Sequence, residues 1–327
     1  MLDCEVDYMK RKFSKAYDSK ETLVMAFEEF IQEKEATNKS KDTIRNYNLS
    51  FNVFYDYHSL TTSTELEEIN MSMIYQWINH LKNNEVRPSS INHYLRDLRT
   101  FFNWCAMRDK IKEPLPIKEL SKQEELPKMY TDEEMEILLE KPRAGDSFSD
   151  WRIWAIISTV YATGLRASTI CALKIGDFDF KHEEIIISQQ KNKKAGILPF
   201  TPAHAACIKE YFKMWLRDAD NDDWAFPNIG GEQLTVSGLR QGIQRYCKAR
   251  GVNAHGIHSI RHNFARAMIV NGGGEYRLQK YLQHSDIKMS QHYVKLFSQD
   301  LKRDAAEFSP LDNAKKKTSR KSQFKKH

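Results

Sequence analysis

The sequence HSIRH at residues 258–262 opens a stretch of helical apolar spacing that runs to residue 308. On a helix, His258, Arg261 and His262 fall on one face, because side chains three and four residues apart are neighbours. His284 and Tyr293 follow, nine residues apart. The fork of an arginine matches the geometry of a phosphate, and an imidazolium donates a second charge-assisted hydrogen bond. Each of these side chains alone is more often structural, but their clustering predicts an anion-binding site.

The region upstream of this cluster predicts a mainly helical domain with one small sheet. Thr131 to Glu134 form a capping box, in which a hydroxyl and a carboxylate satisfy free N–H groups at a helix start. Residues 151–161 are strongly apolar and predict a buried helix that ends at 162–164. Short strands are predicted at 177–180, 184–188 and 197–200, and further helices at 203–216, 236–249 and 258–308.

The first third of the chain predicts a small bundle of four helices. Apolar residues recur at three- and four-residue spacing in segments that begin near Leu23, Ile44, Ile74 and Ile91. We interpret the aromatic residues of these segments as core packing, because a bundle interior requires helical spacing. Cations on the opposite faces are candidate phosphate contacts or ordinary surface charge, namely Arg87, Arg96, Arg99 and Arg108.

Composition describes a folded protein with room for two domains, since the chain has 327 residues, 41% hydrophobic and 29% charged. The net charge of +6 is weak support for nucleic-acid binding, because residues 313–327 alone hold seven lysines and arginines and no acid. Five cysteines without a CxxC pair favour reduced thiols over a zinc site or a disulfide framework. No apolar stretch approaches the roughly 18 residues of a membrane span, and no signal-peptide core is seen, so we expect a cytoplasmic protein.

Four segments, in their order and spacing, resemble the boxes of the phage integrase, or tyrosine recombinase, family. YATGLRAS at residues 161–168 resembles the first arginine box, and HSIRH at 258–262 resembles the HxxRH box. QKNKKAGILP at 190–199 resembles the hairpin that carries the family's lysine, and YLQH at 281–284, continued to Tyr293, resembles the final segment. The match covers most of the chain, and the helical N-terminal region is similar to the family's core-binding domain.

Two positions depart from the family's pattern, and one assignment is open. Thr169 stands where the family usually has Glu or Asp, three residues after the first arginine, and Gln283 stands where it usually has glycine. The family's lysine corresponds to Lys191, Lys193 or Lys194, which share one turn. We choose Lys191, because it lies eight residues before the proline of the next predicted strand, which is the family's typical spacing.

The resemblance implies a mainly α fold. We expect an N-terminal four-helix, SAM-like core-binding domain and an α+β catalytic domain of the DNA breaking-rejoining type with a small β-sheet. Along the chain we expect an N-terminal extension (1–20), the core-binding domain (21–108), an extended Pro-bearing linker (109–130), the catalytic domain (131–310) and a basic tail (311–327).

The resemblance also implies the chemistry. Tyr293 would attack the scissile phosphate, expel the 5′ hydroxyl and form a 3′-phosphotyrosine that conserves the bond energy for religation. Lys191 is the candidate general acid for the leaving hydroxyl, and His258 is the candidate acceptor of the tyrosine proton. No metal or cofactor is expected, because arginines supply the charge and one phosphodiester replaces another. The charge that grows on the phosphate would be neutralised by Arg166, Arg261 and His284.

The expected partner is double-stranded DNA at specific sites, contacted by both domains. Lys193 and Lys194 join the arginines of the N-terminal region as candidate phosphate contacts. Members of the family act as tetramers on two paired sites and usually pass a C-terminal helix to a neighbour, so residues 299–308 are the candidate donor helix. An accessory DNA-bending or excisionase protein is a further candidate partner, and no membrane contact is expected.

Several biological roles fit the resemblance. We expect integration, excision or transposition of a mobile element, with Xer-like resolution of chromosomes or plasmids as the alternative. About twenty residues precede the first predicted helix, so no separate arm-binding domain is expected. A type IB topoisomerase, which relaxes DNA as a monomer, and a catalytically silent DNA-binding protein are the rival interpretations. The chain layout argues against the first rival, and the complete catalytic set argues against the second.

Overall fold

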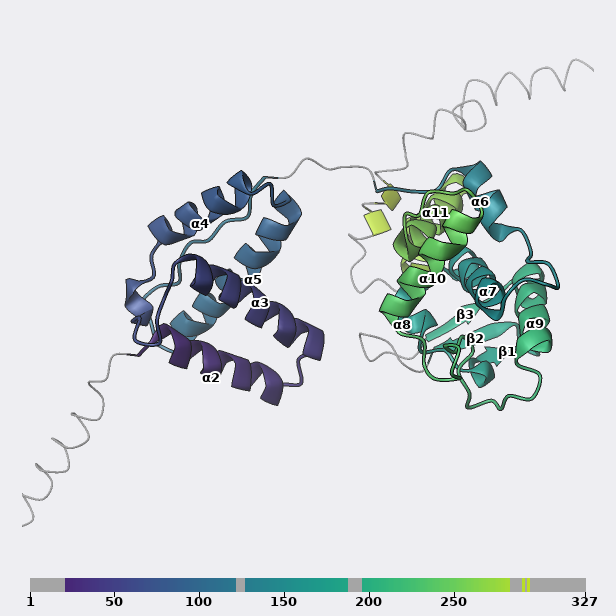
Figure 1. Cartoon of the computed structure of the whole chain (residues 1–327), viewed down its shortest axis with the longest axis horizontal. Helices are drawn as coiled ribbons and strands as arrows, with labels where there is room; N and C mark the ends of the chain where they lie inside the picture. Colours follow the sequence, from purple (N-terminus) through teal and green to yellow (C-terminus); the bar gives the residue numbers. More distant parts are fainter. Residues whose placement is uncertain (1–20, 122–126, 188–195, 283–289, 292, 295–327) are drawn as a thin grey trace, which may run out of the picture. The chain divides into compact units, whose positions relative to one another are not determined.

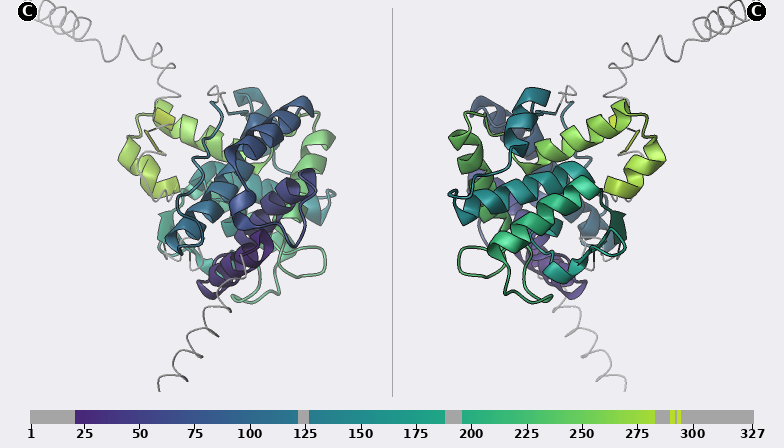
Figure 2. Two further views of the ribbon diagram at one scale, coloured as in Figure 1. Left: turned by 90° about the vertical axis from the view of Figure 1, so that its left-hand side faces the viewer. Right: turned by 90° about the vertical axis from the view of Figure 1, so that its right-hand side faces the viewer.

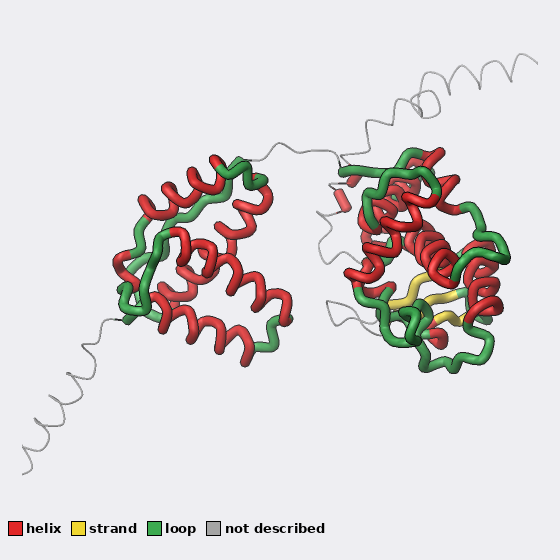
Figure 3. The backbone as a smooth tube through the Cα atoms, viewed as in Figure 1, coloured by secondary structure: helices red, strands yellow, loops and turns green. Residues whose placement is uncertain are grey.

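The computed structural model describes residues 21–121, 127–187, 196–282, 290–291 and 293–294. The chain divides into two compact units, Met1–Glu124 and Glu125–His327. Both are mainly helical, and a small three-stranded sheet belongs to the second unit (Figures 1 and 3). This architecture confirms the predicted fold class. None of the described helices is both long and apolar enough to span a membrane.

The first unit is built from four helices, most of which start at a side-chain cap. The side chains of Thr22, Ser40 and Asn70 each accept a hydrogen bond from a first-turn backbone N–H. These caps satisfy donors that have no partner within the helix. A short 3₁₀ turn at Leu66–Glu68 precedes the third helix. The four helices, all predicted from spacing, are α2 (Leu23–Ala36), α3 (Lys41–Tyr57), α4 (Met71–Asn83) and α5 (Pro88–Met107).

Aromatic side chains form much of the core of the first unit, as their spacing predicted. Phe27 stacks on Phe51 with ring centroids 3.7 Å apart, and Phe30 meets Phe101 edge to face at 5.5 Å. Trp77 of α4 is fully buried. Because aromatic pairs add to the free energy gained by burying apolar area, these contacts stabilise the packing of α2 and α3 against α5.

Residues 110–121, which we expected within an extended linker, lie against the first unit. Ile117 is 3% exposed and packs with the core of that unit. The amide of Asn92 on α5 donates to the Leu120 carbonyl at 2.9 Å and accepts from the Leu120 N–H at 2.7 Å. A buried amide needs such partners, because leaving a polar group unpaired away from water costs about 1–3 kcal/mol. No periodic pattern marks this contact in the sequence, since it depends on one asparagine of another helix.

The second unit combines an antiparallel sheet with several helices. The strand order is β1-β2-β3, and Ile185 of the middle strand lies opposite Phe178 on one side and Leu198 on the other. The strands are β1 (Phe178–Asp179), β2 (Glu184–Ile187) and β3 (Gly196–Pro199). The helices are α6 (Asp132–Leu139), α7 (Phe148–Thr163), α8 (Ala167–Ile170), α9 (Pro202–Trp215), α10 (Val236–Ala249), α11 (Ile257–Val270) and α12 (Glu275–Leu282).

Helix α7 runs through the middle of the second unit. It packs against α11 and against α9, and for this reason most of its residues are buried (Figures 1 and 2). It starts at Ser147, which forms a capping box with Asp150, and the predicted capping box at Thr131 starts α6 in the same way. It ends at Gly164, whose φ of 68° is left-handed. This turn carries the chain directly into Leu165 and Arg166.

Gly164→Ala is expected to destabilise the second unit by about 2–5 kcal/mol, because backbone strain and a steric clash add together. The left-handed backbone disfavours any residue with a Cβ. That Cβ would also lie 2.5 Å from Phe264 Cδ1 and 2.6 Å from Leu282 Cδ2. Urea unfolding measures the loss.

Gly251→Ala is the matched control for this prediction. Gly251 has a φ of +70°, but a Cβ added there meets no heavy atom of the described chain within 4 Å. Its alanine variant should therefore lose only the strain, roughly 1–2 kcal/mol. Equal losses for the two variants would contradict the close packing of Phe264 and Leu282 around Gly164.

Candidate active site

Arg261 is held by two backbone carbonyls. It lies on α11 and is 6% exposed. Its Nη1 donates to the carbonyl of Gly164, and its Nη2 donates to the carbonyl of Leu282 at 2.8 Å. One guanidinium thus joins the C-terminal ends of α7 and α12. The group is oriented before any ligand arrives, as electrostatic catalysis requires.

Arg166 brings a second positive charge to the same place. It is the N-cap residue of α8 and is half-buried. Burial and, next, the charge of Arg166 lower the pKa of Arg261 to about 10, so Arg261 stays protonated at neutral pH. Among the ion pairs of the described residues, none includes Arg166. Two like charges so placed repel each other, and a bound anion would relieve that repulsion.

The hydroxyl of Tyr293 lies within this positive cluster. It is 2.8 Å from Nδ1 of His262 and is also hydrogen-bonded to Arg261. Burial raises the pKa of the phenol, whereas Arg261 and Arg166 act in the opposite direction by stabilising the phenolate. The fold therefore brings the predicted nucleophile together with both predicted arginines.

His258 lies in the first turn of α11 and is exposed. Partial desolvation lowers the pKa of its imidazole, and the charges of Arg261, Arg166 and Arg240 lower it further. The imidazole is therefore neutral at neutral pH in the absence of a ligand. An anion beside the same arginines would raise the pKa again, so the protonation of His258 depends on what the site holds.

The remaining predicted site residues lie outside the described residues. They are Lys191, Lys193, Lys194 and His284, together with Gln283 and the candidate donor helix at 299–308. Thr169, which departs from the family's carboxylate, is described: it lies within α8 and is 6% exposed.

Three arginines of the first unit that we predicted as candidate phosphate contacts are engaged by carboxylates. Arg96 and Arg99 both contact Glu119, at 2.9 and 3.0 Å, and Arg108 contacts Glu33. Arg87 is the N-cap residue of α5. Arg96 and Arg99 would have to exchange Glu119 for a phosphate to bind DNA. The pairs are partly exposed, and exposed ion pairs contribute only about 0.2–1 kcal/mol, so this exchange costs little.

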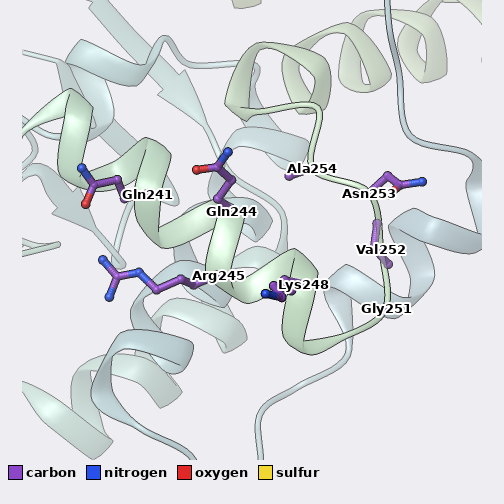
Figure 4. Close-up of a pocket in the computed structure, with 8 residues that line it drawn as sticks. All are labelled: Gln241, Gln244, Arg245, Lys248, Gly251, Val252, Asn253 and Ala254. Atoms are coloured by element: carbon purple, nitrogen blue, oxygen red, sulfur yellow. The ribbon is translucent and has the colours of Figure 1, made fainter.

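A groove lies along α10, the helix that carries Arg240. Figure 4 shows Gln241, Gln244, Arg245 and Lys248 following one another along the helix, with the loop 251–254 beside them. The groove has a volume of about 610 Å³, and no acidic residue lines it. Because Arg240 acts on His258, this helix borders the candidate site. The sequence spacing predicted α10 as a helix but did not indicate its relation to the site.

The sequence analysis placed His262 in the predicted anion-binding site but assigned it no role in the reaction. The HxxRH pattern placed it on the same helix face as His258 and Arg261, but nothing in the sequence indicated which histidine meets Tyr293. That contact depends on where the fold places Tyr293 relative to α11. The position next to Arg261 was the available signal.

The described part of the site can bind an oxyanion next to a phenol. The Tyr293 hydroxyl is hydrogen-bonded to His262 and Arg261 and lies in the field of Arg166. The imidazole of His258 lies in the field of the same two arginines. Such donors would stabilise both a phenolate and the charge that develops on a reacting phosphate. In the part of the chain that the structure describes, no group of three or more His, Cys, Asp or Glu side chains is placed to hold a metal ion.

Known proteins resemble this chain across both units. Residues 128–300 match the Phage integrase family, and residues 24–109 match its N-terminal SAM-like domain. Tyrosine recombinase XerC of Staphylococcus aureus (strain USA300 / TCH1516) is 27% identical over 274 residues, which are 81% of this chain and 90% of that protein.

Two solved structures share the fold. The Tn1549 transposon integrase in complex with a circular intermediate DNA has a TM-score of 0.66 at 18% identity, over 83% of this chain and 94% of that chain. The lambda integrase tetramer bound to a Holliday junction has a TM-score of 0.68 at 15% identity, over 84% of this chain and 78% of that chain.

Proposed function

This chain belongs to the phage integrase family of tyrosine recombinases, which are DNA breaking-rejoining enzymes, and we propose that it cuts and rejoins specific DNA sites through Tyr293. The observation that supports this proposal most is the position of the Tyr293 hydroxyl, which is hydrogen-bonded to Arg261 and lies in the field of Arg166. A phenol in that environment is suited to attack a phosphate that the same arginines hold.

The proposed reaction proceeds through a 3′-phosphotyrosine. A phenol with its ordinary pKa of about 10 is a weak nucleophile at neutral pH, so the neighbouring cations must stabilise its anion. Arg166 and Arg261 neutralise the non-bridging oxygens as the phosphate becomes pentacoordinate. His284 joins them at the phosphate, and Lys191 protonates the leaving 5′ hydroxyl. Each strand is then rejoined by the reverse reaction with a new 5′ hydroxyl.

Both parts of the chain are proposed to contact the duplex. In the first part, residues 21–108, Arg87 and the two arginines that share Glu119 bind phosphates. In the second part, residues 131–310, Lys193 and Lys194 supply further phosphate contacts, with residues 109–130 joining the two. Phosphate contacts position a protein on DNA, whereas contacts to base edges select the sequence.

The proposed active assembly is a tetramer on two paired sites. The likeness to the fold of the lambda integrase tetramer, which is bound to a Holliday junction, supports this proposal. Residues 299–308 would pass to a neighbouring subunit, and an accessory DNA-bending or excisionase protein would set the direction of the reaction. We place the reaction in the cytoplasm. Sedimentation with and without DNA tests the assembly: a complex that holds one protomer per site and never pairs two sites would contradict it.

The groove along α10 is proposed to read the DNA sequence. Glutamine amides match the donor and acceptor edge of adenine, and one bidentate contact of this kind gives about 1–3 kcal/mol of discrimination. Gln244→Ala is therefore expected to weaken binding to the preferred site but not to random DNA. Lys248→Ala should weaken both and lower the salt slope of binding by about 0.9.

Competition binding over a salt series measures both effects. Lys213→Ala on α9, which removes another exposed lysine, is the control and should leave the slope unchanged. A Gln244→Ala variant that loses specific and random binding equally would show that Gln244 does not read bases.

The biological role that we propose is movement of a mobile element, with Xer-like resolution as the alternative. The fold likeness to the Tn1549 transposon integrase supports the first role, and the 27% identity to XerC supports the second. A binding site selected from random duplexes, placed in pairs on a plasmid, tests the recombinase activity. Recombinant products are expected, whereas relaxation of supercoils without recombinants would indicate a topoisomerase.

A further inference from the structure

We propose that His262, rather than His258, is the general base that accepts the phenolic proton of Tyr293, a role that rests on the proposed function and assigns one of its proton transfers. The contact that carries this inference is direct. The Tyr293 oxygen lies 2.8 Å from His262 Nδ1, and the two rings lie with centroids 5.5 Å apart at 42°. A general base must lie within about 2.6–3.2 Å of the atom whose proton it takes, and Nδ1 meets that requirement.

The backbone of His262 is fixed by both of its neighbours. On one side, Arg261 is bonded to the carbonyls of Gly164 and Leu282. On the other side, the Asn263 amide donates to the Tyr130 carbonyl at 2.7 Å and accepts from the Tyr130 N–H at 3.1 Å. Both neighbours are buried. His262 is thus presented toward Tyr293 from a rigid turn of α11, which favours a catalytic role over an accidental surface contact.

The charges around His262 keep its imidazole ready to accept a proton. Burial lowers the pKa of His262, and the neighbouring His258 and Arg261 of the same helix lower it further. The ring is therefore neutral at neutral pH, and with its proton on Nε2 it offers a lone pair at Nδ1. Burial raises the pKa of Tyr293. Consequently the proton stays on the phenol at rest and leaves as the bond to phosphorus forms.

The proposed step balances without a further reactant. The phenolic proton moves to His262 Nδ1, the phenolic oxygen forms a bond to phosphorus, and the bond from phosphorus to the 5′ oxygen breaks. A separate acid protonates that 5′ oxygen. In religation His262 returns its proton to the departing phenol. His258 then remains available to the phosphate, consistent with its place among Arg261, Arg166 and Arg240.

Two substitutions separate proton transfer from positioning. His262→Asn places an amide group near the position of Nδ1, where its oxygen can accept the phenolic hydrogen bond but cannot take the proton. His262→Ala removes both functions. We expect both variants to slow formation of the covalent adduct by roughly 10²–10⁴-fold in single-turnover cleavage of a nicked duplex, the usual range for a lost general base. His182→Asn, which replaces an exposed histidine of the same unit, should cleave at the wild-type rate.

The pH profile gives a readout that a purely structural role would not change. Since the neutral imidazole is the active form, the wild-type rate should fall as the pH drops through the lowered pKa of His262. The groups that face this imidazole are His258 and Arg261 of α11 and Tyr293. His258 also titrates in the acidic range. His262→Asn should remove the limb that belongs to His262. His258→Asn should keep that limb but move it to higher pH, because the charge of His258 helps to lower the pKa of His262.

A substrate with sulfur in place of the bridging 5′ oxygen identifies which proton transfer is lost. A thiolate leaves without protonation, so this substrate restores the rate of a variant that lacks the acid. His262→Asn should remain slow on it, because the phenol still has to lose its proton. Restoration of the His262→Asn rate, or a His262→Asn rate within about threefold of wild type on the ordinary substrate, would overturn the inference. Failure of the wild-type chain to form any adduct would instead overturn the proposed function.

Discussion

Tyr293→Phe should abolish the covalent protein–DNA adduct while leaving DNA binding intact. The substitution removes a single oxygen, and that oxygen is the atom proposed to bond to phosphorus. No other hydroxyl is proposed to lie at that position, so the expected loss in cleavage rate is on the order of 10⁶-fold, comparable to removing the nucleophile of a covalent protease. An SDS-resistant band on a nicked duplex measures the adduct, and a mobility-shift assay measures binding.

Tyr276→Phe is the matched control for the nucleophile. Tyr276 lies on α12 and is 63% exposed, so its variant should form the adduct at the wild-type rate. A Tyr293→Phe protein that still forms an undiminished adduct would contradict the assignment of the nucleophile. The phenylalanine also removes the hydrogen bonds to His262 and Arg261, and for this reason the thermal stability of both variants has to be compared with wild type.

Arg261→Lys is expected to lower the cleavage rate by at least about 10²-fold, because a preorganised hydrogen-bond donor to the reacting phosphate is lost. Lysine keeps the charge but lacks the planar fork. It cannot bond the carbonyls of Gly164 and Leu282 and still present a second donor edge to a phosphate. Single-turnover cleavage at saturating protein measures this loss separately from DNA affinity.

The same substitution should lower the stability of the second unit. At least one of the two carbonyls would lose its partner, and an unsatisfied buried acceptor costs about 1–3 kcal/mol. Urea unfolding measures that cost. Arg266→Lys, on the same helix but paired with Asp132 at 3.3 Å on the surface, should change neither rate nor stability. If Arg261→Lys behaves like Arg266→Lys, the guanidinium does not have the role that we assign to it.

Periodicity predicted the helices well because burial imposes it. The four helices of the first unit, and α9 and α10 of the second, each present an apolar face to a core at helical spacing. Helix α7 was predicted instead from its nearly continuous apolar run, which is buried on all sides. The capping box at Thr131 was also predictable from the sequence, since a cap is a local interaction. The packing of residues 110–121 could not be predicted from the sequence, because Asn92 binds Leu120 across 28 residues without a repeating pattern.

The site was predictable as a set of residue types and not as a set of contacts. The HSIRH sequence placed His258, Arg261 and His262 on one helix, and the family resemblance added Arg166 and Tyr293. Which histidine meets the phenol depends on where the fold places Tyr293 relative to α11. The two carbonyl partners of Arg261 are backbone atoms, which carry no sequence signal. The ion pair between Arg96 and Glu119 likewise depends on tertiary packing, and no sequence pattern indicates it.

The most direct test of the account is to identify the residue that becomes esterified to DNA. The full-length protein would be trapped on a nicked duplex, digested with a protease and a nuclease, and analysed by mass spectrometry. We predict that a nucleotide is attached through its 3′ phosphate to Tyr293 and that this adduct is absent from Tyr293→Phe. A nucleotide attached to any other side chain, or through a 5′ phosphate, would contradict the central claim.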